Sequence, residues 1–248
     1  MTEKLYLIDS YLKECTSIVT FIDPLNPKKI ELDKTVFYAV SGGQPSDVGL
    51  ITSLSDSKSH HVVCVKNELN RTLHELNSET ELKVGDSVKC AIDWDLRYKH
   101  MRMHSSAHIL AAIIFKETKT LITGNQLGAE ESRMDFSVKD FDRNYLQSIE
   151  DKANEIIARD LPITISFEDR EKALERKELF RLKDKLPKDI PIFRILSIDD
   201  FDVQADGGTH VKSTSEVGRI KITDMKNKGA ENRRIYWKLE DKLQMVVE

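Results

Sequence analysis

The hydrophobic pattern of the chain changes near residue 95, and this change restricts the fold more than any other feature of the sequence. Before it, short runs rich in β-branched and aromatic residues alternate with turn residues. These runs span residues 17–22, 35–40, 61–65 and 84–92. Short strands with no helical segments between them are typical of a small antiparallel barrel. We therefore predict a β-barrel domain over residues 1–94.

Over residues 95–116 the apolar positions recur with the period of an amphipathic helix. The predicted buried face of this helix consists of Met103, Ala107, Leu110 and Ile114. Further helices are predicted over residues 145–159 and 171–185, and further strands at 133–136, 163–167 and 219–222. Because these helices and strands do not alternate regularly, we expect an α+β domain over residues 95–248.

The composition is that of a globular chain with a hydrophobic core. Of 248 residues, 40% are apolar, and 38 basic against 42 acidic side chains give a formal net charge of −4. This balance excludes a disordered polyelectrolyte and a uniformly basic nucleic-acid coat, but it leaves room for a local basic patch. No run approaches the ~20 apolar residues of a membrane helix, and the start does not resemble a signal peptide. The three cysteines, Cys15, Cys64 and Cys90, are odd in number and well separated, which predicts reduced thiols in a cytoplasmic protein.

Two histidines, His104 and His108, lie four residues apart in the predicted helix. Residues at this spacing share one helix face with Cβ atoms ~5–6 Å apart, so two imidazoles can bind one zinc ion. The helix lacks the glutamate of a HExxH motif, which argues against a zinc protease. By themselves the two histidines also fit an ordinary helix surface, so the interpretation needs a third ligand from elsewhere.

A candidate third ligand is His210, which follows the diglycine of the segment 206–211. Two glycines let the backbone bend tightly and bring its amide groups close to a ligand. Asp206 lies four residues before His210 and can either add an oxygen ligand or orient a histidine by a hydrogen bond. Taken alone, the same segment also fits a plain hairpin turn.

Four segments together resemble the editing domain of alanyl-tRNA synthetase. They are residues 94–110 with the paired histidines, the glycine-rich turn of residues 37–49, the diglycine segment 206–211 and the basic segment 228–235. In the glycine-rich turn, the residues that match the family motif are Gly42, Gly43, Gln44, Asp47 and Gly49. With only residues 1–94 before the editing signature, the chain is similar to the free-standing AlaX proteins of medium length. The resemblance implies a second domain of the threonyl/alanyl-tRNA synthetase additional-domain type.

The sequence departs from this family at two positions. The diglycine motif of the family usually starts with cysteine, where this chain has Asp206, and one glycine of the glycine-rich turn is Ser41. A carboxylate is a harder ligand than a thiolate and changes the charge of the site. Either Asp206 takes the place of the thiolate, or three histidines and a water molecule complete an open zinc site.

The resemblance implies hydrolysis, without ATP, of the ester that joins a wrong amino acid to the acceptor end of tRNA(Ala). Serine is the main expected amino acid and glycine the second, because a synthetase pocket separates either from alanine by only ~1–3 kcal/mol. Zn²⁺ held by the histidines is expected to activate water or to anchor the substrate end. The residues expected to carry the reaction are His104, His108 and His210, with Thr123 and then Gln126 selecting serine.

Basic residues crowd the last part of the chain, beside the aromatic residues Tyr236 and Trp237. The predicted tRNA contacts are Arg219, Lys221, Lys228, Arg233 and Arg234. Such a stripe can follow a phosphate backbone, and it fits a solvated strand face equally well. Two rival functions stay open, a tRNA-binding module that has lost turnover and a zinc hydrolase of small esters.

Overall fold

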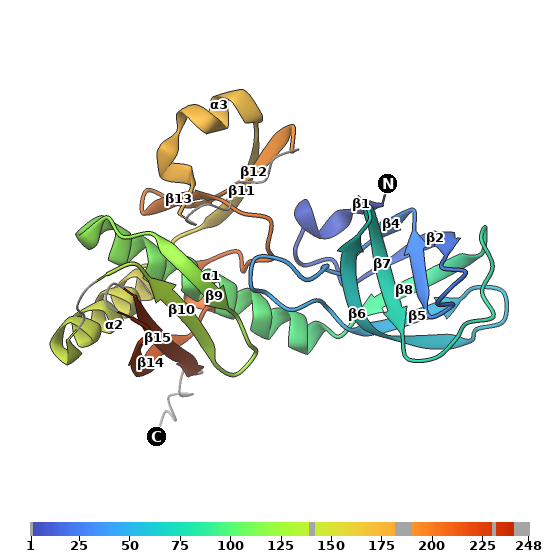
Figure 1. Ribbon diagram of the computed structural model, residues 1–248, viewed down its shortest axis with the longest axis horizontal. Helices are drawn as coiled ribbons and strands as arrows, with labels where there is room; N and C mark the ends of the chain where they lie inside the picture. The colour runs from blue at the N-terminus through green and yellow to red at the C-terminus, as the bar shows by residue number, and fades with distance from the viewer. Residues whose placement is uncertain (1, 139–141, 182–189, 230–231, 241–248) are drawn as a thin grey trace, which may run out of the picture. The chain divides into compact units, whose positions relative to one another are not determined.

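The computed structural model describes residues 2–138, 142–181, 190–229 and 232–240. The chain divides into two compact units, Met1–Tyr98 and Lys99–Glu248, and helix α1 (Trp94–Thr118) begins in the first and continues in the second (Figure 1). The first unit contains a closed antiparallel barrel, and the second combines helices with two antiparallel sheets. The predicted α+β class with an N-terminal barrel is confirmed. None of the described helices is long and apolar enough to cross a membrane.

The barrel has six strands, in the spatial order β2-β3-β7-β6-β5-β8. Their bounds are β2 Glu14–Ile22, β3 Lys29–Leu32, β5 Gly49–Ser53, β6 Ser59–Glu68, β7 Arg71–Leu76 and β8 Ser87–Ile92. A short strand β1 (Glu3–Lys4) pairs in parallel with β4 (Lys34–Thr35), and a 3-10 turn at Leu5–Leu7 follows β1. Because successive side chains of a strand point to opposite faces, alternate residues such as Val88, Cys90 and Ile92 of β8 are buried. Apolar side chains from all six strands fill the barrel.

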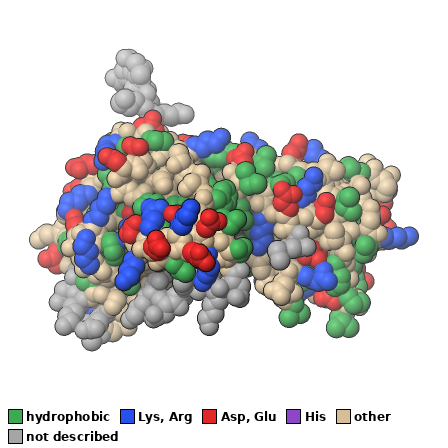
Figure 2. Space-filling model, turned by 90° about the horizontal axis from the view of Figure 1, so that it is seen from above, with side chains coloured by type: hydrophobic (Ala, Val, Ile, Leu, Met, Phe, Trp, Pro, Cys, Tyr) green, Lys and Arg blue, Asp and Glu red, His purple; other side chains and the backbone are tan. Residues whose placement is uncertain are grey.

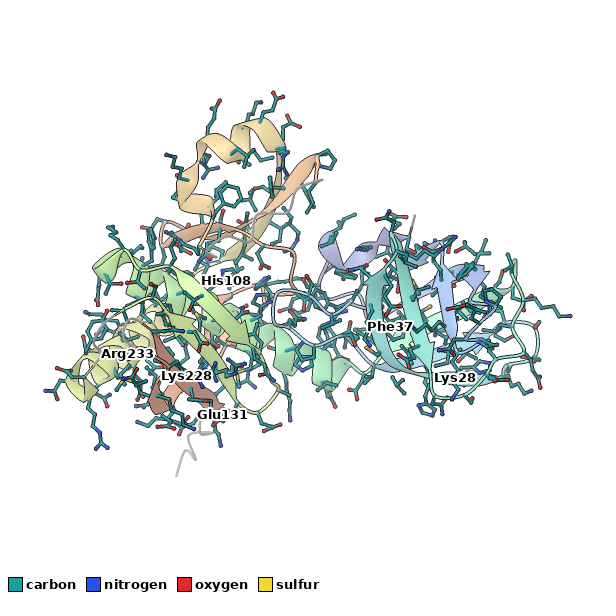
Figure 3. All side chains as sticks on the ribbon, viewed as in Figure 1. Lys28, Phe37, His108, Glu131, Lys228 and Arg233 are labelled. Carbon is teal, nitrogen blue, oxygen red and sulfur yellow. The ribbon has the colours of Figure 1, made fainter. Side chains whose placement is uncertain are left out.

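Residues 36–40 do not continue a strand, so the predicted strand over 35–40 is wrong: β4 ends at Thr35. Phe37, labelled in Figure 3, is buried, and so is Tyr38. Their backbone amides donate to side chains, Phe37 N–H to Thr35 Oγ1 at 3.0 Å and Tyr38 N–H to Asp47 Oδ2 at 2.6 Å. Acceptors close in sequence therefore satisfy amides that a strand would direct to a neighbouring strand.

The larger sheet of the second unit has the strand order β14-β15-β10-β9. Its strands are β9 Ile122–Gln126, β10 Ser132–Phe136, β14 Arg219–Asn227 and β15 Arg233–Glu240. In β15 the residues Arg233, Ile235 and Trp237 are buried, and Trp237 Nε1 donates to Ser106 Oγ of α1 at 2.8 Å. Helix α1 therefore covers the face that carries Trp237. We call the opposite face, which carries Arg234 and Tyr236, the outer face.

Helix α2 (Arg143–Ala158) corresponds to the helix predicted over residues 145–159. Asp142 caps its N-terminus, where the carboxylate accepts the Tyr145 N–H at 2.7 Å. The helix lies along β14, because the Asn154 side chain bonds to both the N–H (2.9 Å) and the carbonyl (3.0 Å) of Ile220. Its buried apolar stripe consists of Leu146, Ile149, Ala153 and Ile157.

The smaller sheet contains, in order, β11 (Ile163–Asp169), β12 (Ile192–Ile198) and β13 (Asp202–Ala205). A short helix α3 (Arg170–Glu175) and a 3-10 turn at Lys177–Leu179 follow β11, and a second such turn at Thr214–Glu216 precedes β14.

The helix predicted over residues 171–185 is therefore too long, since α3 ends at Glu175. Leu179 turns back to pack with Phe193 and Ile195 of β12, which ends the helix early. The remainder of that prediction, residues 182–185, lies outside the described residues. Acidic and basic side chains are interspersed around α3 (Figure 2), as expected for an exposed segment.

Candidate metal centre

Helix α1 places His104 and His108 one turn apart, with their ring centroids separated by 5.1 Å. Both side chains are buried, although imidazole is polar. The reason is that α1 is covered on more than one side, and much of its length is buried, including Met101, Ile109 and Ala112. The two histidines, of which Figure 3 labels His108, therefore face other parts of the protein.

The segment after β13 brings two more side chains to the same place. The ring of His210 lies 4.4 Å from that of His104 and 5.0 Å from that of His108, measured between centroids. Asp206 Oδ1 lies 2.7 Å from His210 Nε2. Asp206 Oδ2 lies 3.5 Å from His104 Nε2 and 3.7 Å from His108 Nε2. One ligand atom from each of these four residues lies within 4.8 Å of the other three.

The diglycine lets this segment approach α1. A β-carbon built on Gly208 would overlap the Cε1 and Nδ1 atoms of His104, so a larger residue at position 208 would displace that imidazole. The Gly208 N–H donates to Asp206 Oδ1 at 2.6 Å, which holds the carboxylate over the turn. Gly207 has no described atom within 4 Å of such a β-carbon. Close approach at the site therefore requires Gly208 in particular.

Two residues that the sequence analysis did not single out hold the segment in place. Asp206 N–H donates to the carbonyl of Arg194 on β12 at 3.0 Å, and Arg194 Nη1 donates back to the Asp206 carbonyl at 3.0 Å. On α1, Ser105 Oγ accepts the Val211 N–H at 3.3 Å and lies 3.4 Å from His210 Nδ1. The sequence does not identify either residue. The contact between Arg194 and Asp206 depends on the pairing of β12 with β13 in space, and a serine between two histidines does not by itself indicate a supporting role.

Burial and mutual contact determine the charges in the cluster. Burial lowers the pKa of His104 well below its usual value, and burial likewise lowers the pKa of His210 to about 4. Burial alone would raise the pKa of Asp206, but its electrostatic interaction with His104 and hydrogen bonds from His108 and His210 hold it well below its usual range. These pKa values leave the imidazoles of His104 and His210 neutral and Asp206 a carboxylate anion near neutral pH.

This donor set fits a divalent metal ion. Neutral imidazole nitrogen and carboxylate oxygen are ligands of zinc and of other first-row metals. The Nε2 atoms of His104 and His108 both face Asp206 Oδ2, so one ion could be reached by all three atoms. The cluster is therefore a candidate metal centre.

The two residues expected to select serine lie on β9 and are not members of the cluster. Thr123 Oγ1 donates to Asn232 Oδ1 at 3.2 Å. Gln126 pairs in register with Arg133 and accepts from Arg133 Nε at 3.1 Å. Since Arg133 is in turn the register partner of Tyr236, Gln126 lies on the outer face, away from α1 and its histidines. A catalytic role for Gln126 at the cluster is therefore not supported.

Some of the predicted tRNA contacts are exposed, whereas others are bonded to carboxylates of the protein. Arg219 and Lys228 are exposed, while Lys221 Nζ lies 3.0 Å from Glu150 Oε1 of α2. Arg234 donates to both carboxylate oxygens of Asp135, at 2.6 and 2.8 Å. Lys228 and Arg233 are labelled in Figure 3, and residues 230–231 of the basic segment lie outside the described part.

The prediction that Arg233 contacts RNA beside Trp237 is not supported, because both side chains are buried. Arg233 Nη1 donates to Asn227 Oδ1 at 3.0 Å and to the Gly229 carbonyl at 2.8 Å, so it ties β14 to β15. Both residues have the same parity along the strand as the apolar Ile235, which points inward. That parity was a signal in the sequence that could have predicted their burial.

The glycine-rich turn has a structural role in the first unit. Gly42 and Gly43 adopt φ of +57° and +87° in a turn that backbone hydrogen bonds close between Ser41 and Gln44, which is buried. A β-carbon on Gly49 would overlap the Ala91 carbonyl of the neighbouring β8.

Asp47 of the same turn is buried and accepts hydrogen bonds from Arg97 Nε at 2.9 and 3.0 Å and from Arg97 Nη2. Arg97 also donates to the carbonyls of Ser10 (2.9 Å) and Val36 (2.7 Å). The turn is therefore bound to the first residues of α1.

Two family models match the chain. The model of the "Threonyl and Alanyl tRNA synthetase second additional domain" matches residues 193–236, and that of "tRNA synthetases class II (A)" matches residues 10–96. The alanyl-tRNA editing protein AlaX-M of Methanosarcina barkeri is 42% identical over 245 residues, which are 97% of this chain and 100% of that protein. AlaX-M of Saccharolobus solfataricus is 38% identical over 237 residues (96% and 98%), and AlaX-L of Pyrococcus horikoshii is 34% identical over 227 residues (90% and 54%).

The first unit and the second unit thus each contain a segment that matches a domain of aminoacyl-tRNA synthetases. The chain belongs to the AlaX family of alanyl-tRNA editing proteins, in its AlaX-M form. The resemblance inferred from four short segments is confirmed.

Proposed function

We propose that this protein deacylates mischarged tRNA(Ala), removing serine and, as a second substrate, glycine from its acceptor end. The observation that carries this proposal is the convergence of His104, His108, Asp206 and His210 in a chain whose relatives are named alanyl-tRNA editing proteins. We assign the reaction to a domain of residues 95–248, supported by a barrel domain of residues 1–94.

The proposed cofactor is Zn²⁺, held by His104 and His108 from α1 and by His210 from the diglycine segment. Three imidazoles and a carboxylate are an acceptable donor set for this ion. When bound, zinc supplies Lewis-acid chemistry: it polarises a carbonyl or lowers the pKa of a water molecule. The burial of the three imidazoles keeps bulk water away and strengthens every electrostatic interaction in the site.

The two oxygens of Asp206 support different roles. Oδ1 is engaged by the Gly208 N–H at 2.6 Å and by His210 Nε2 at 2.7 Å, so it holds the segment together. Oδ2 faces His104 and His108 at 3.5 and 3.7 Å and is the oxygen placed to meet an ion. We therefore assign Asp206 to the position that cysteine takes in the family motif, as a ligand through Oδ2.

Rejection of alanine requires a polar contact to the serine hydroxyl. A site built to hydrogen-bond a hydroxyl disfavours a substrate without one, because its own polar group is left unpaired. Thr123 is the proposed contact, since its hydroxyl bonds to the Asn232 side chain and its oxygen retains acceptor capacity for a second hydroxyl. The exposed Arg219 and Lys228 are the proposed contacts to tRNA phosphates.

The test is hydrolysis of Ser-tRNA(Ala), Gly-tRNA(Ala) and Ala-tRNA(Ala) by the purified protein, with and without a chelator. We expect Ser-tRNA(Ala) to be hydrolysed fastest, Ala-tRNA(Ala) slowest, and the activity to disappear with chelator and return with zinc. Binding of tRNA without hydrolysis above buffer would identify a binding module. Turnover of small esters with no preference for charged tRNA would identify a general hydrolase.

A further inference from the structure

The outer face of the larger sheet carries a tyrosine among cations. Tyr236 of β15 pairs in register with Arg133 of β10 on one side and with Asp224 of β14 on the other. Lys226 Nζ lies 4.9 Å from the centroid of the Tyr236 ring. Arg234, two residues away on the same strand, lies on the same face. An aromatic ring with cations beside it is a typical contact for nucleic acid.

A groove opens beside this tyrosine. It has a volume of about 260 Å³ and is lined by Gln126, Gly128, Glu131, Ser132, Arg133 and Tyr236. The Arg133 guanidinium is held by Gln126 at 3.1 Å, so a flat cationic group and an aromatic ring stand together at the groove. Such a pair offers stacking surfaces, while the Gln126 and Glu131 side chains (the latter labelled in Figure 3) offer hydrogen-bonding groups to the edge of a base.

The cations of this face favour an RNA strand as the occupant. Basic side chains on β10, β14 and β15 of this face are Arg133, Arg219, Lys221, Lys226, Arg234 and Lys238. Each of them lies within 4.0 Å of a carboxylate, but six cations share five carboxylates, so the cations are in excess by one. Lys226 and Lys238 are more than half exposed, whereas the groove itself contains the carboxylate of Glu131. A phosphate is therefore disfavoured inside the groove and favoured along its basic flanks, as expected if a base enters it and the backbone runs outside.

We propose that this groove binds one unpaired or splayed nucleotide of the tRNA, with its base stacked on Tyr236 and Arg133 and its phosphates beside Lys226 and Lys238. The proposal rests on the proposed function, which makes tRNA the partner. Helix α1 with His104 and His108 covers the other face of the sheet, so the groove is separate from the candidate metal centre. It therefore contributes to tRNA affinity and takes no part in hydrolysis.

The experiment measures the affinity of the full chain for uncharged tRNA(Ala) over a range of salt concentrations. Loss of one stacked base predicts that Tyr236→Ala binds about 5- to 150-fold more weakly, whereas Tyr236→Phe stays within about twofold of the wild type. Lys226→Ala is expected to weaken binding and to reduce the slope of log K against log salt by about 0.7–0.9, one phosphate contact. Lys152→Ala, which removes an exposed cation of α2, is the control and leaves binding unchanged.

Wild-type affinity in Tyr236→Ala would overturn the proposal, as would equal losses in the alanine and phenylalanine variants. Hydrolysis of a seryl ester of adenosine, which lacks the rest of the tRNA, separates this proposal from the proposed function. The variants are expected to hydrolyse it at the wild-type rate. If the wild type binds tRNA through Tyr236 but hydrolyses neither this ester nor Ser-tRNA(Ala), the proposed deacylase function is refuted and the groove proposal is not. If the wild type does not bind tRNA, the groove proposal is refuted.

Discussion

Gly208 lies directly against the imidazole of His104, so that a β-carbon at position 208 would overlap two ring atoms. Gly207, its neighbour in the same motif, has open space at the corresponding position. The two glycines of the diglycine therefore differ in function: one makes room for a candidate metal ligand, and the other can accept a side chain. This difference provides a matched pair of variants.

Gly208→Ala is expected to displace His104 and to weaken zinc binding by at least about tenfold, the scale of losses when the support of a ligand is disturbed. Gly207→Ala should stay within about twofold of the wild type. Competition with a chromophoric chelator measures both affinities, and circular dichroism checks that both variants are folded. Equal zinc affinity in the two variants would contradict the assignment of His104 as a ligand.

Thr123→Val is expected to lower the ratio of the Ser-tRNA(Ala) rate to the Ala-tRNA(Ala) rate, because the variant keeps the shape but loses the hydroxyl. A lost hydrogen bond of this kind is worth roughly 0.5–1.5 kcal/mol, about 2- to 13-fold in the ratio. Thr164→Val, at an exposed position of β11, is the control. If both variants retain the wild-type ratio, the selecting residue is not Thr123.

Asp47→Ala tests the buried pair that binds the glycine-rich turn to the start of α1. The side chains of Asp47 and Arg97 are 1% and 0% exposed, so the variant leaves an uncompensated buried charge. We expect a loss of about 3–5 kcal/mol in the free energy of unfolding by urea. Glu81→Ala, which removes the exposed partner of Lys58, should change it by less than about 1 kcal/mol. Similar losses in the two variants would show that the buried pair does not stabilise the barrel.

His74 makes the stability of the barrel depend on pH. Burial lowers the pKa of this histidine to about 4, whereas the unfolded chain has the ordinary value near 6.5. As pH falls from 6.5 to 4, the unfolded state takes up a proton that the folded state does not, so stability falls. Between pH 7 and pH 5, the free energy of unfolding of the wild type should fall by about 2 kcal/mol more than that of His74→Gln.

His61→Gln, which replaces an exposed histidine of β6, is the matched control for this pH effect. It should keep the pH dependence of the wild type in the same urea titrations. A wild type and a His74→Gln variant with parallel stability curves would mean that His74 titrates normally in the folded protein.

The prediction of α1 from sequence succeeded because Met103, Ala107, Leu110 and Ile114 are all buried along one face. The same periodicity could not show that His104 and His108 are buried as well, since their burial comes from the diglycine segment, which is distant in sequence. That convergence is a long-range contact, and short-range spacing contains no information about it.

The predictions failed where local chemistry replaced regular structure. Residues 36–40 have the composition of a strand, but the Thr35 and Asp47 side chains accept the amides of Phe37 and Tyr38, which a strand would offer to a neighbour. Arg233 was predicted to contact RNA from its charge, whereas its position beside Ile235 in the strand places it inside. For these residues, alternation along the strand was a better guide than side-chain type.

We propose that three histidines and an aspartate hold one divalent ion that hydrolysis requires. The direct measurement compares zinc content and the rate of Ser-tRNA(Ala) hydrolysis in the wild type and in the double variant His104→Ala/His108→Ala. We expect about one zinc ion per chain and rapid hydrolysis in the wild type, and loss of both in a double variant whose barrel remains folded. A folded double variant that hydrolyses Ser-tRNA(Ala) at the wild-type rate would contradict the claim.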